Sequence, residues 1–236
     1  MKASLAALAF ALLAASCAQL PPASTGTPVA TPAALAAASR WKSDLGAFEQ
    51  SDRDRAPVPG SVLFVGSSTI RMWSTLRQDF PERIGVINRG FGGSTLADIA
   101  LLADVLVVRY RPAQVLLYAG DNDLAEGRSP AQVAADFATF VRAVRNAMPD
   151  VRIDFISIKP SPLREALTPK MREANALIEA QTKTLPNTGY IDIFTPMLDA
   201  AGRPRGELFI DDRLHMNDAG YRLWRAAIGP RLIPPH

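Results

Sequence analysis

Cysteine and histidine are both scarce in this chain of 236 residues. Cys17 is the only cysteine, so no disulfide can form within the chain. There are two histidines, and His236 is the last residue, which leaves His215 as the only plausible internal base. A metal centre built on histidines would need more of them. We therefore expect neither a metal nor a cofactor.

The chain also lacks the usual signatures of nucleotide and nucleic-acid binding. No Gly-Lys-Ser or Gly-Lys-Thr loop occurs, and the turn Gly90-Phe91-Gly92-Gly93 does not have dinucleotide-binding spacing. The formal net charge is only +3, and the arginines are scattered among Asp and Glu residues instead of forming a basic stripe. Neither a nucleotide nor a nucleic acid is expected as a partner.

The amino terminus carries an apolar run at residues 5–15 that is too short to span a membrane. Small residues and Cys17 follow it, so we expect a secretory signal peptide over residues 1–16. The position of Cys17 resembles the lipobox of bacterial lipoproteins, in which that cysteine is lipidated, although Ala14 stands where leucine is usual. The expected location is the periplasm or the outer membrane, and plain secretion after cleavage near Ser16 is the alternative.

Residues 17–40 are rich in Pro, Ala and Thr. Such a composition buries little apolar surface and predicts an extended tether, which would hold a lipid-anchored domain away from the membrane. The lipid would be the only contact with the membrane. The folded domain is expected over residues 41–236, with a first helix at 41–48.

Strand-like and helix-like segments alternate along this domain. Short apolar, β-rich runs predict strands at 62–65, 83–88, 115–118, 151–158 and 190–194. Helical patterns lie between them, at 70–80, 96–110, 130–148 and 170–185, and a last helix follows through residue 228. This alternation is typical of parallel βαβ units. We predict an α/β fold, a three-layer α/β/α sandwich whose five-stranded parallel sheet has the flavodoxin-like order two-one-three-four-five.

Polar residues follow successive strands at what would be one edge of this sheet. They are Ser68, the Gly92-Gly93 turn, Asn122 in Gly120-Asp121-Asn122-Asp123, and the Asp212-x-x-His215 pair. Each signal alone has an ordinary structural explanation as turn or cap chemistry. Together they supply the parts that hydrolysis by a serine needs: a nucleophile, a base, a group that orients the base, and donors for the oxyanion.

In these blocks and their order, the sequence resembles the SGNH, or GDSL-type, hydrolase superfamily. The resemblance implies that Ser68 is the nucleophile, that His215 is the base and that Asp212 orients it. It also implies an oxyanion hole formed by the backbone N–H groups of Ser68 and Gly93 and the side-chain amide of Asn122. The Gly-Asp-Ser of the family is Gly66-Ser67-Ser68 here, so Ser67 stays open as a contributor.

The expected function is therefore that of an exported serine esterase acting through an acyl-enzyme. The resemblance implies carboxylic-ester substrates, namely acetylated carbohydrate, lysophospholipid or simple acyl esters, and the sequence does not choose among them. A different class of function also fits the amino terminus: a non-catalytic envelope lipoprotein that uses the same fold to bind a ligand.

Overall fold

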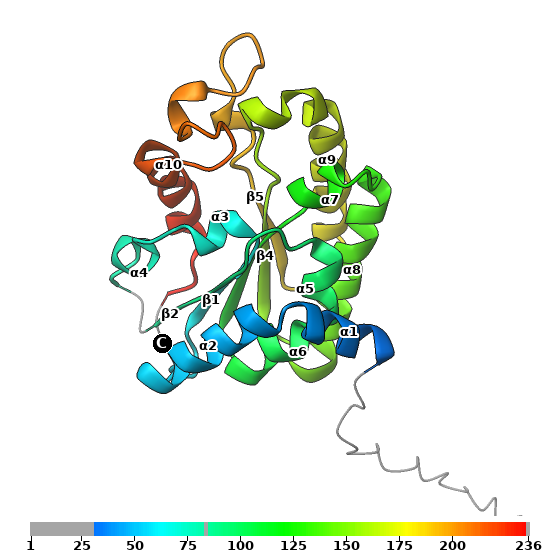
Figure 1. The fold of residues 1–236 in the computed structure, drawn as a ribbon, viewed down its shortest axis with the longest axis vertical. Coiled ribbons are helices and arrows are strands. Elements are labelled where there is room, and N and C mark those ends of the chain that lie inside the picture. Colours follow the sequence, from blue (N-terminus) through cyan, green and yellow to red (C-terminus); the bar gives the residue numbers. More distant parts are fainter. Residues whose placement is uncertain (1–30, 83–84, 235–236) are drawn as a thin grey trace, which may run out of the picture. The chain divides into compact units, whose positions relative to one another are not determined.

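The computed structural model describes residues 31–82 and 85–234, which are built around a five-stranded sheet (Figure 1). All pairings are parallel, and the strand order is β2-β1-β3-β4-β5. The strands are β1 (Val62–Gly66), β2 (Val86–Gly90), β3 (Gln114–Tyr118), β4 (Arg152–Ile156) and β5 (Thr188–Ile191). The predicted fold class and strand order are confirmed.

Helices occupy the connections and both ends of this region. The α-helices are α1 (Pro32–Arg40), α2 (Lys42–Asp54), α3 (Ser68–Arg71), α4 (Leu76–Asp79), α5 (Leu96–Leu101), α6 (Ala103–Leu106), α7 (Asp121–Ala125), α8 (Pro130–Ala147), α9 (Thr168–Thr182) and α10 (Asp218–Ile228). Short 3₁₀ segments are η1 (Val108–Tyr110), η2 (Pro162–Leu167), η3 (Thr195–Met197), η4 (Gly206–Leu208) and η5 (Gly229–Arg231).

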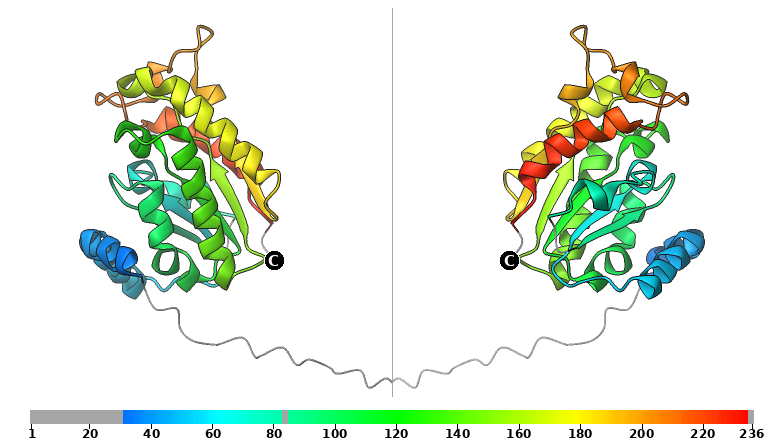
Figure 2. Two further views of the ribbon diagram at one scale, coloured as in Figure 1. Left: turned by 90° about the vertical axis from the view of Figure 1, so that its right-hand side faces the viewer. Right: turned by 90° about the vertical axis from the view of Figure 1, so that its left-hand side faces the viewer.

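The sheet separates two apolar layers, because neighbouring side chains along a strand point to opposite faces. Leu63 and Val65 of β1 belong to a core that includes side chains of α5, α8 and α9. Val62 and Phe64 belong to a second core, which Trp224 of α10 helps to fill. Figure 2 views the molecule from both sides, with α8 and α9 in front in one panel and α10 in front in the other. Every residue of β1 is buried, as expected for a central parallel strand.

The prediction of an extended tether over residues 17–40 is wrong for its last nine residues, which form helix α1. Thr31 caps this helix by accepting a hydrogen bond from the backbone N–H of Ala34 at 3.2 Å, and Pro32 occupies the first turn. The alanines that made the segment look featureless are strong helix formers. Ala37 is buried in the core, and Arg40 forms an ion pair with Asp98 of α5. The expected signal peptide, Cys17 and the tether as far as residue 30 lie outside the described residues.

The helical segments predicted at 70–80 and 96–110 are divided in the structure. Residues 70–80, where one or two helical turns are expected, contain the end of α3 and helix α4. The carbonyls of Thr69 and Ile70, near the end of α3, accept hydrogen bonds from side chains that are distant in the sequence. The Tyr221 hydroxyl donates to the first at 2.9 Å, and the Asn88 amide donates to the second at 2.8 Å. Residues 96–110 are likewise divided into α5, α6 and η1.

Candidate active site

Ser68 follows the carboxyl end of β1 and is the first residue of α3. The turn is tight because β1 and β3 approach closely at Gly66, where a Cβ atom would lie 2.2 Å from the carbonyl oxygen of Tyr118. The backbone N–H of Ser67 donates to that same oxygen at 3.2 Å. No side chain larger than glycine's fits at residue 66, so the local sequence fixes where Ser68 emerges from the sheet.

His215 and Asp212 reach Ser68 from one loop before α10. His215 Nε2 lies 2.8 Å from Ser68 Oγ, and His215 Nδ1 lies 2.6 Å from Asp212 Oδ2. Because a carboxylate accepts, the second contact assigns the proton to Nδ1 and leaves Nε2 to accept from the serine hydroxyl. The three predicted residues are thus aligned from a hydroxyl through an imidazole to a carboxylate.

The backbone holds the Asp212 carboxylate in place. Its Oδ1 accepts hydrogen bonds from the backbone N–H groups of Leu214 at 2.9 Å and His215 at 2.8 Å. Arg213 adopts a left-handed conformation with φ of 58°, which folds the loop tightly enough for these bonds. Partial desolvation raises the pKa of the Asp212 carboxyl, but the hydrogen bonds from the His215 ring and the two N–H groups outweigh it and lower that pKa to about 2. Asp212 is therefore ionised at neutral pH.

Ser67, the alternative nucleophile, has a different environment. Its side chain is fully buried, and its hydroxyl has no hydrogen-bond partner within the described residues. The hydroxyl of Ser68, in contrast, is hydrogen-bonded to His215. Of the two neighbouring serines, only Ser68 has the base beside it.

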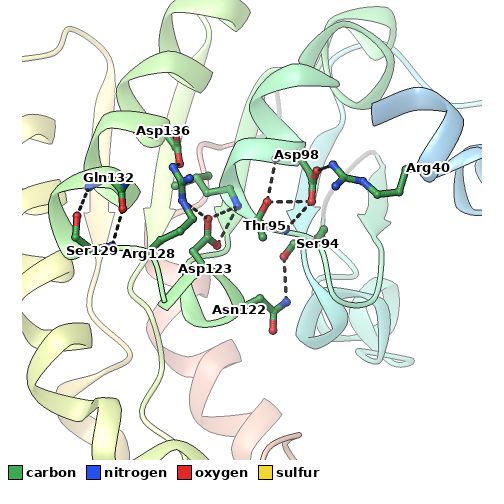
Figure 3. A network of polar contacts seen from close by, with 11 residues as sticks. Arg40, Ser94, Thr95, Asp98, Asn122, Asp123, Arg128, Ser129, Gln132 and Asp136 are labelled. Atoms are coloured by element: carbon green, nitrogen blue, oxygen red, sulfur yellow. Dashed lines mark hydrogen bonds and ion pairs between the residues drawn. The ribbon is translucent and has the colours of Figure 1, made fainter. Parts of the chain in front are cut away.

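Candidate hydrogen-bond donors follow β2 and β3, the two strands that flank β1 in the sheet. Asn122, in the first turn of α7, donates from Nδ2 to the carbonyl of Ser94 at 3.0 Å (Figure 3) and keeps a second N–H on the same nitrogen. Gly93 has a φ of 81°, a conformation that favours glycine. The backbone N–H groups of Ser68 and Gly93 form no hydrogen bond within residues 31–82 and 85–234. They are available to a developing oxyanion.

Asp123 ties this donor loop to helix α5. Both of its carboxylate oxygens accept from the backbone N–H of Leu96, at 3.0 and 3.1 Å, and Arg128 lies 3.8 Å away (Figure 3). Burial outweighs these contacts and raises the pKa of the Asp123 carboxyl to about 6. Since Asn122 binds the carbonyl of Ser94 and Asp123 binds the N–H of Leu96, the two neighbours fix the segment that follows Gly93.

A charged cluster behind Asn122 was not predicted from the sequence. Lys159 is only 1% exposed, and its Nζ lies 3.4 Å from Oδ2 of Asp121. Arg164 of η2 places Nη1 3.1 Å from the same oxygen and donates from Nη2 to Oδ1 of Asn122 at 3.0 Å. Burial raises the pKa of the Asp121 carboxyl, but the two cations beside it lower it further, so this carboxylate is charged.

Within the described residues, no group of three or more His, Cys, Asp or Glu side chains is arranged to hold a metal ion. None of the helices in this part of the chain is long and apolar enough to cross a membrane.

Comparison with known proteins identifies the family. The model of the GDSL-like lipase/acylhydrolase family matches residues 63–223, which is more than half of the chain. The chain belongs to this family. It is a carboxylic ester hydrolase. The resemblance to GDSL-type hydrolases in its sequence motifs is therefore confirmed. A comparison with curated proteins found no match.

Solved structures share the fold at low sequence identity. A protein from Streptococcus pneumoniae named as a candidate platelet activating factor aligns with a TM-score of 0.72 and 18% identity, over 86% of this chain and 100% of that one. A GDSL-like lipase from Bacteroides thetaiotaomicron has a TM-score of 0.66 and 23% identity, covering 82% and 95%. An acetylxylan esterase from Geobacillus stearothermophilus has a TM-score of 0.60 and 15% identity, covering 75% and 97%.

Proposed function

We propose that the protein hydrolyses carboxylic esters through an acyl-enzyme formed on Ser68. The observation that carries this proposal is the alignment of Ser68, His215 and Asp212, with contacts of 2.8 and 2.6 Å. His215 accepts the hydroxyl proton as Ser68 Oγ attacks the carbonyl carbon. The tetrahedral intermediate then collapses, the bond to the alcohol oxygen breaks, and His215 returns the proton to the departing alcohol.

Water completes the cycle at the same site. It attacks the acyl carbon while His215 again accepts a proton, and the bond to Ser68 breaks to release the acid and restore the serine. In both steps negative charge develops on the carbonyl oxygen. The N–H groups of Ser68 and Gly93 and the amide of Asn122 stabilise that charge. Asp212, ionised at neutral pH, stabilises the imidazolium that forms in each step.

The substrate classes are acetylated carbohydrates, lysophospholipids and simple acyl esters. The first class has support from a structural neighbour whose name is acetylxylan esterase. p-Nitrophenyl acetate and longer p-nitrophenyl esters, compared with acetylated xylan, separate acyl-chain preference from sugar recognition.

A labelling experiment tests the nucleophile. A fluorophosphonate reacts with a serine only when a working base activates it, so wild type and Ser67→Ala should be labelled and hydrolyse esters, while Ser68→Ala should do neither. Labelling of Ser68→Ala but not of Ser67→Ala would transfer the role to Ser67. Absence of labelling in the wild type would favour a ligand-binding protein and contradict the proposal.

The cellular location is a separate proposal that rests on the amino-terminal sequence. The apolar run at 5–15, the following Cys17 and the Pro-, Ala- and Thr-rich residues after it support export and attachment through a lipid on that cysteine. The enzyme would then act in the periplasm or at the outer membrane. Cleavage near Ser16 without lipidation would instead give a secreted enzyme.

A further inference from the structure

A pocket of about 240 Å³ lies away from Ser68, beside the edge strand β2. It is lined by residues that precede β1 and β2, among them Ser61 and Gly85, whereas Ser68 follows the carboxyl end of β1. The end of α2 and helix α4 contribute the other walls. The pocket therefore lies toward the opposite end of the strands from the catalytic residues.

Arginines dominate the charge of this pocket. Arg55, Arg77 and Arg89 all line it, and Asp52 is the single carboxylate among the described residues that line it. That carboxylate is already occupied, because it forms an ion pair with Arg89 and accepts from the Tyr110 hydroxyl at 2.8 Å. Within the described part of the chain, Arg55 and Arg77 form no ion pair. The pocket thus holds an excess of positive charge that its own side chains do not neutralise.

Arg89 adds a donor that lacks a partner. Its side chain is only 3% exposed and lies between the rings of Phe48 and Tyr110, with the guanidinium carbon 5.1 and 4.4 Å from their centroids. Nε of Arg89 is buried without a hydrogen-bond partner among the described residues. A buried donor in this state costs free energy that a ligand oxygen would recover.

The three guanidinium groups are close enough to affect one another. Burial lowers the pKa of Arg77, and the positive charges of Arg55 and Arg89 lower it further, while Asp52 opposes them. The mutual repulsion is therefore built into the folded state and would be relieved by an anion.

We propose that this pocket binds a phosphate or phosphomonoester dianion. A guanidinium offers paired N–H donors that match two oxygens of a phosphate, and a tetrahedral anion can present oxygens to several guanidiniums at once. Asp52 already neutralises Arg89, so the two negative charges of such a dianion would balance the charges of the other two arginines, Arg55 and Arg77. A soluble phosphomonoester and a phospholipid headgroup share this chemistry.

Calorimetric titration of the protein with inorganic phosphate, at constant ionic strength set with sodium chloride, tests the site. We expect saturable binding by the wild type and at least tenfold weaker binding by Arg77→Gln and by Arg55→Gln. Arg77 is half-buried and Arg55 is exposed. Arg222→Gln, an exposed arginine of α10, is the matched control and should bind as the wild type does. Unchanged ester hydrolysis in all three variants would show that they are folded, because Arg55 and Arg77 line a pocket at the other end of the strands and Arg222 is exposed.

Two further titrations identify the source of the anion. Glycerol phosphate represents soluble phosphomonoesters, and phosphatidylcholine vesicles with and without phosphatidic acid represent a membrane. If glycerol phosphate or the phosphatidic acid vesicles bind to the wild type and to Arg222→Gln but not to Arg77→Gln, the site is supported and its ligand class is identified. No saturable binding of any of the three by the wild type, or binding that Arg77→Gln leaves unchanged, would overturn the proposal.

Discussion

Arg164 donates a hydrogen bond from Nη2 to Oδ1 of Asn122 at 3.0 Å, on the side of the amide away from its donor nitrogen. Nη1 of the same guanidinium lies 3.1 Å from Asp121, so Arg164 is itself held in place. The bond fixes which end of the amide carries the nitrogen, and a cation on the oxygen polarises the N–H bonds. In the mechanism proposed above, Arg164 would act on the reaction through Asn122, as a positioning residue.

Replacement of Arg164 by Gln should lower kcat about tenfold and leave KM nearly unchanged, because the loss of charge-assisted orientation affects a donor that is needed most in the transition state. Arg164→Lys keeps the positive charge beside Asp121 but loses the paired N–H donors of the guanidinium, so its kcat should lie between those of the wild type and Arg164→Gln. Arg203→Gln, at an exposed arginine with a carboxylate partner, is the control. A kcat equal to that of the wild type in Arg164→Gln would exclude this role.

Asn122→Ala should lower kcat by on the order of 100- to 1000-fold, since it removes one oxyanion donor. If Arg164 acts through Asn122, adding Arg164→Gln to Asn122→Ala should cause little further loss of kcat. Steady-state kinetics of the two single variants and the double variant measure this coupling. Additive losses would mean that Arg164 acts by another route, and an unaffected kcat in Asn122→Ala would remove Asn122 from the reaction.

Sequence patterns were sufficient for the strands, their order and the residues around Ser68. Asp212 and His215 are three positions apart, so one loop carries both and no long-range information is needed to pair them. The buried strands are short apolar runs that stand out from the helices between them. The fold then brings the ends of these strands to one edge, which is why residues predicted separately lie together.

Other features depend on contacts that no local pattern records. Lys159 and Arg164 are charged residues in a segment that looks like a Pro-rich surface loop. Lys159 is buried and Arg164 is half-buried because both cations pair with Asp121, which follows a different strand. Helix α1 was missed because its alanines are found in tethers as well as in helices, and its ion pair with Asp98 joins distant parts of the chain. The side chains of Tyr221 and Asn88 also donate to the carbonyls of Thr69 and Ile70 at the end of α3, and these contacts join distant parts of the chain.

The membrane anchor can be tested without affecting the catalytic site. Cys17→Ser should move the protein from the membrane fraction to the soluble fraction and leave its esterase activity unchanged, because the variant removes only the site of lipidation. Fractionation with activity assays, and mass spectrometry of the amino-terminal peptide, measure the two effects. A wild-type protein that is already soluble and carries no lipid would disprove the anchor.

Asp123 should make the folded state less stable as the pH rises toward neutrality. Its pKa is raised from 3.8 to about 6 on folding, so its contribution to stability is fully present below about pH 3.8 and is lost as the pH rises through about 6. Urea unfolding at pH 4.5 and pH 7.5, compared between wild type and Asp123→Asn, isolates this group. Relative to the variant, the wild type should lose on the order of 2 kcal/mol over that interval. An equal pH dependence in both proteins would contradict the raised pKa.

The dependence of activity on pH should report the base and its carboxylate partner separately. A histidine base must be neutral to accept the Ser68 proton, so kcat/KM should be low at acidic pH, where the ring is protonated, and should rise to a constant value as the pH increases. Asp212, with a pKa of about 2, stays ionised throughout and adds no second titration there.

Asp212→Asn should lower kcat by a factor on the order of 10³ to 10⁴, because an amide neither selects the required ring tautomer nor stabilises the imidazolium. Asp211→Asn, which changes the neighbouring exposed carboxylate, is the matched control and should leave kcat unchanged. A kcat that Asp212→Asn leaves at the wild-type value would show that Asp212 does not orient the base. Undiminished activity in His215→Ala would require a different mechanism, because the sequence has no other internal histidine.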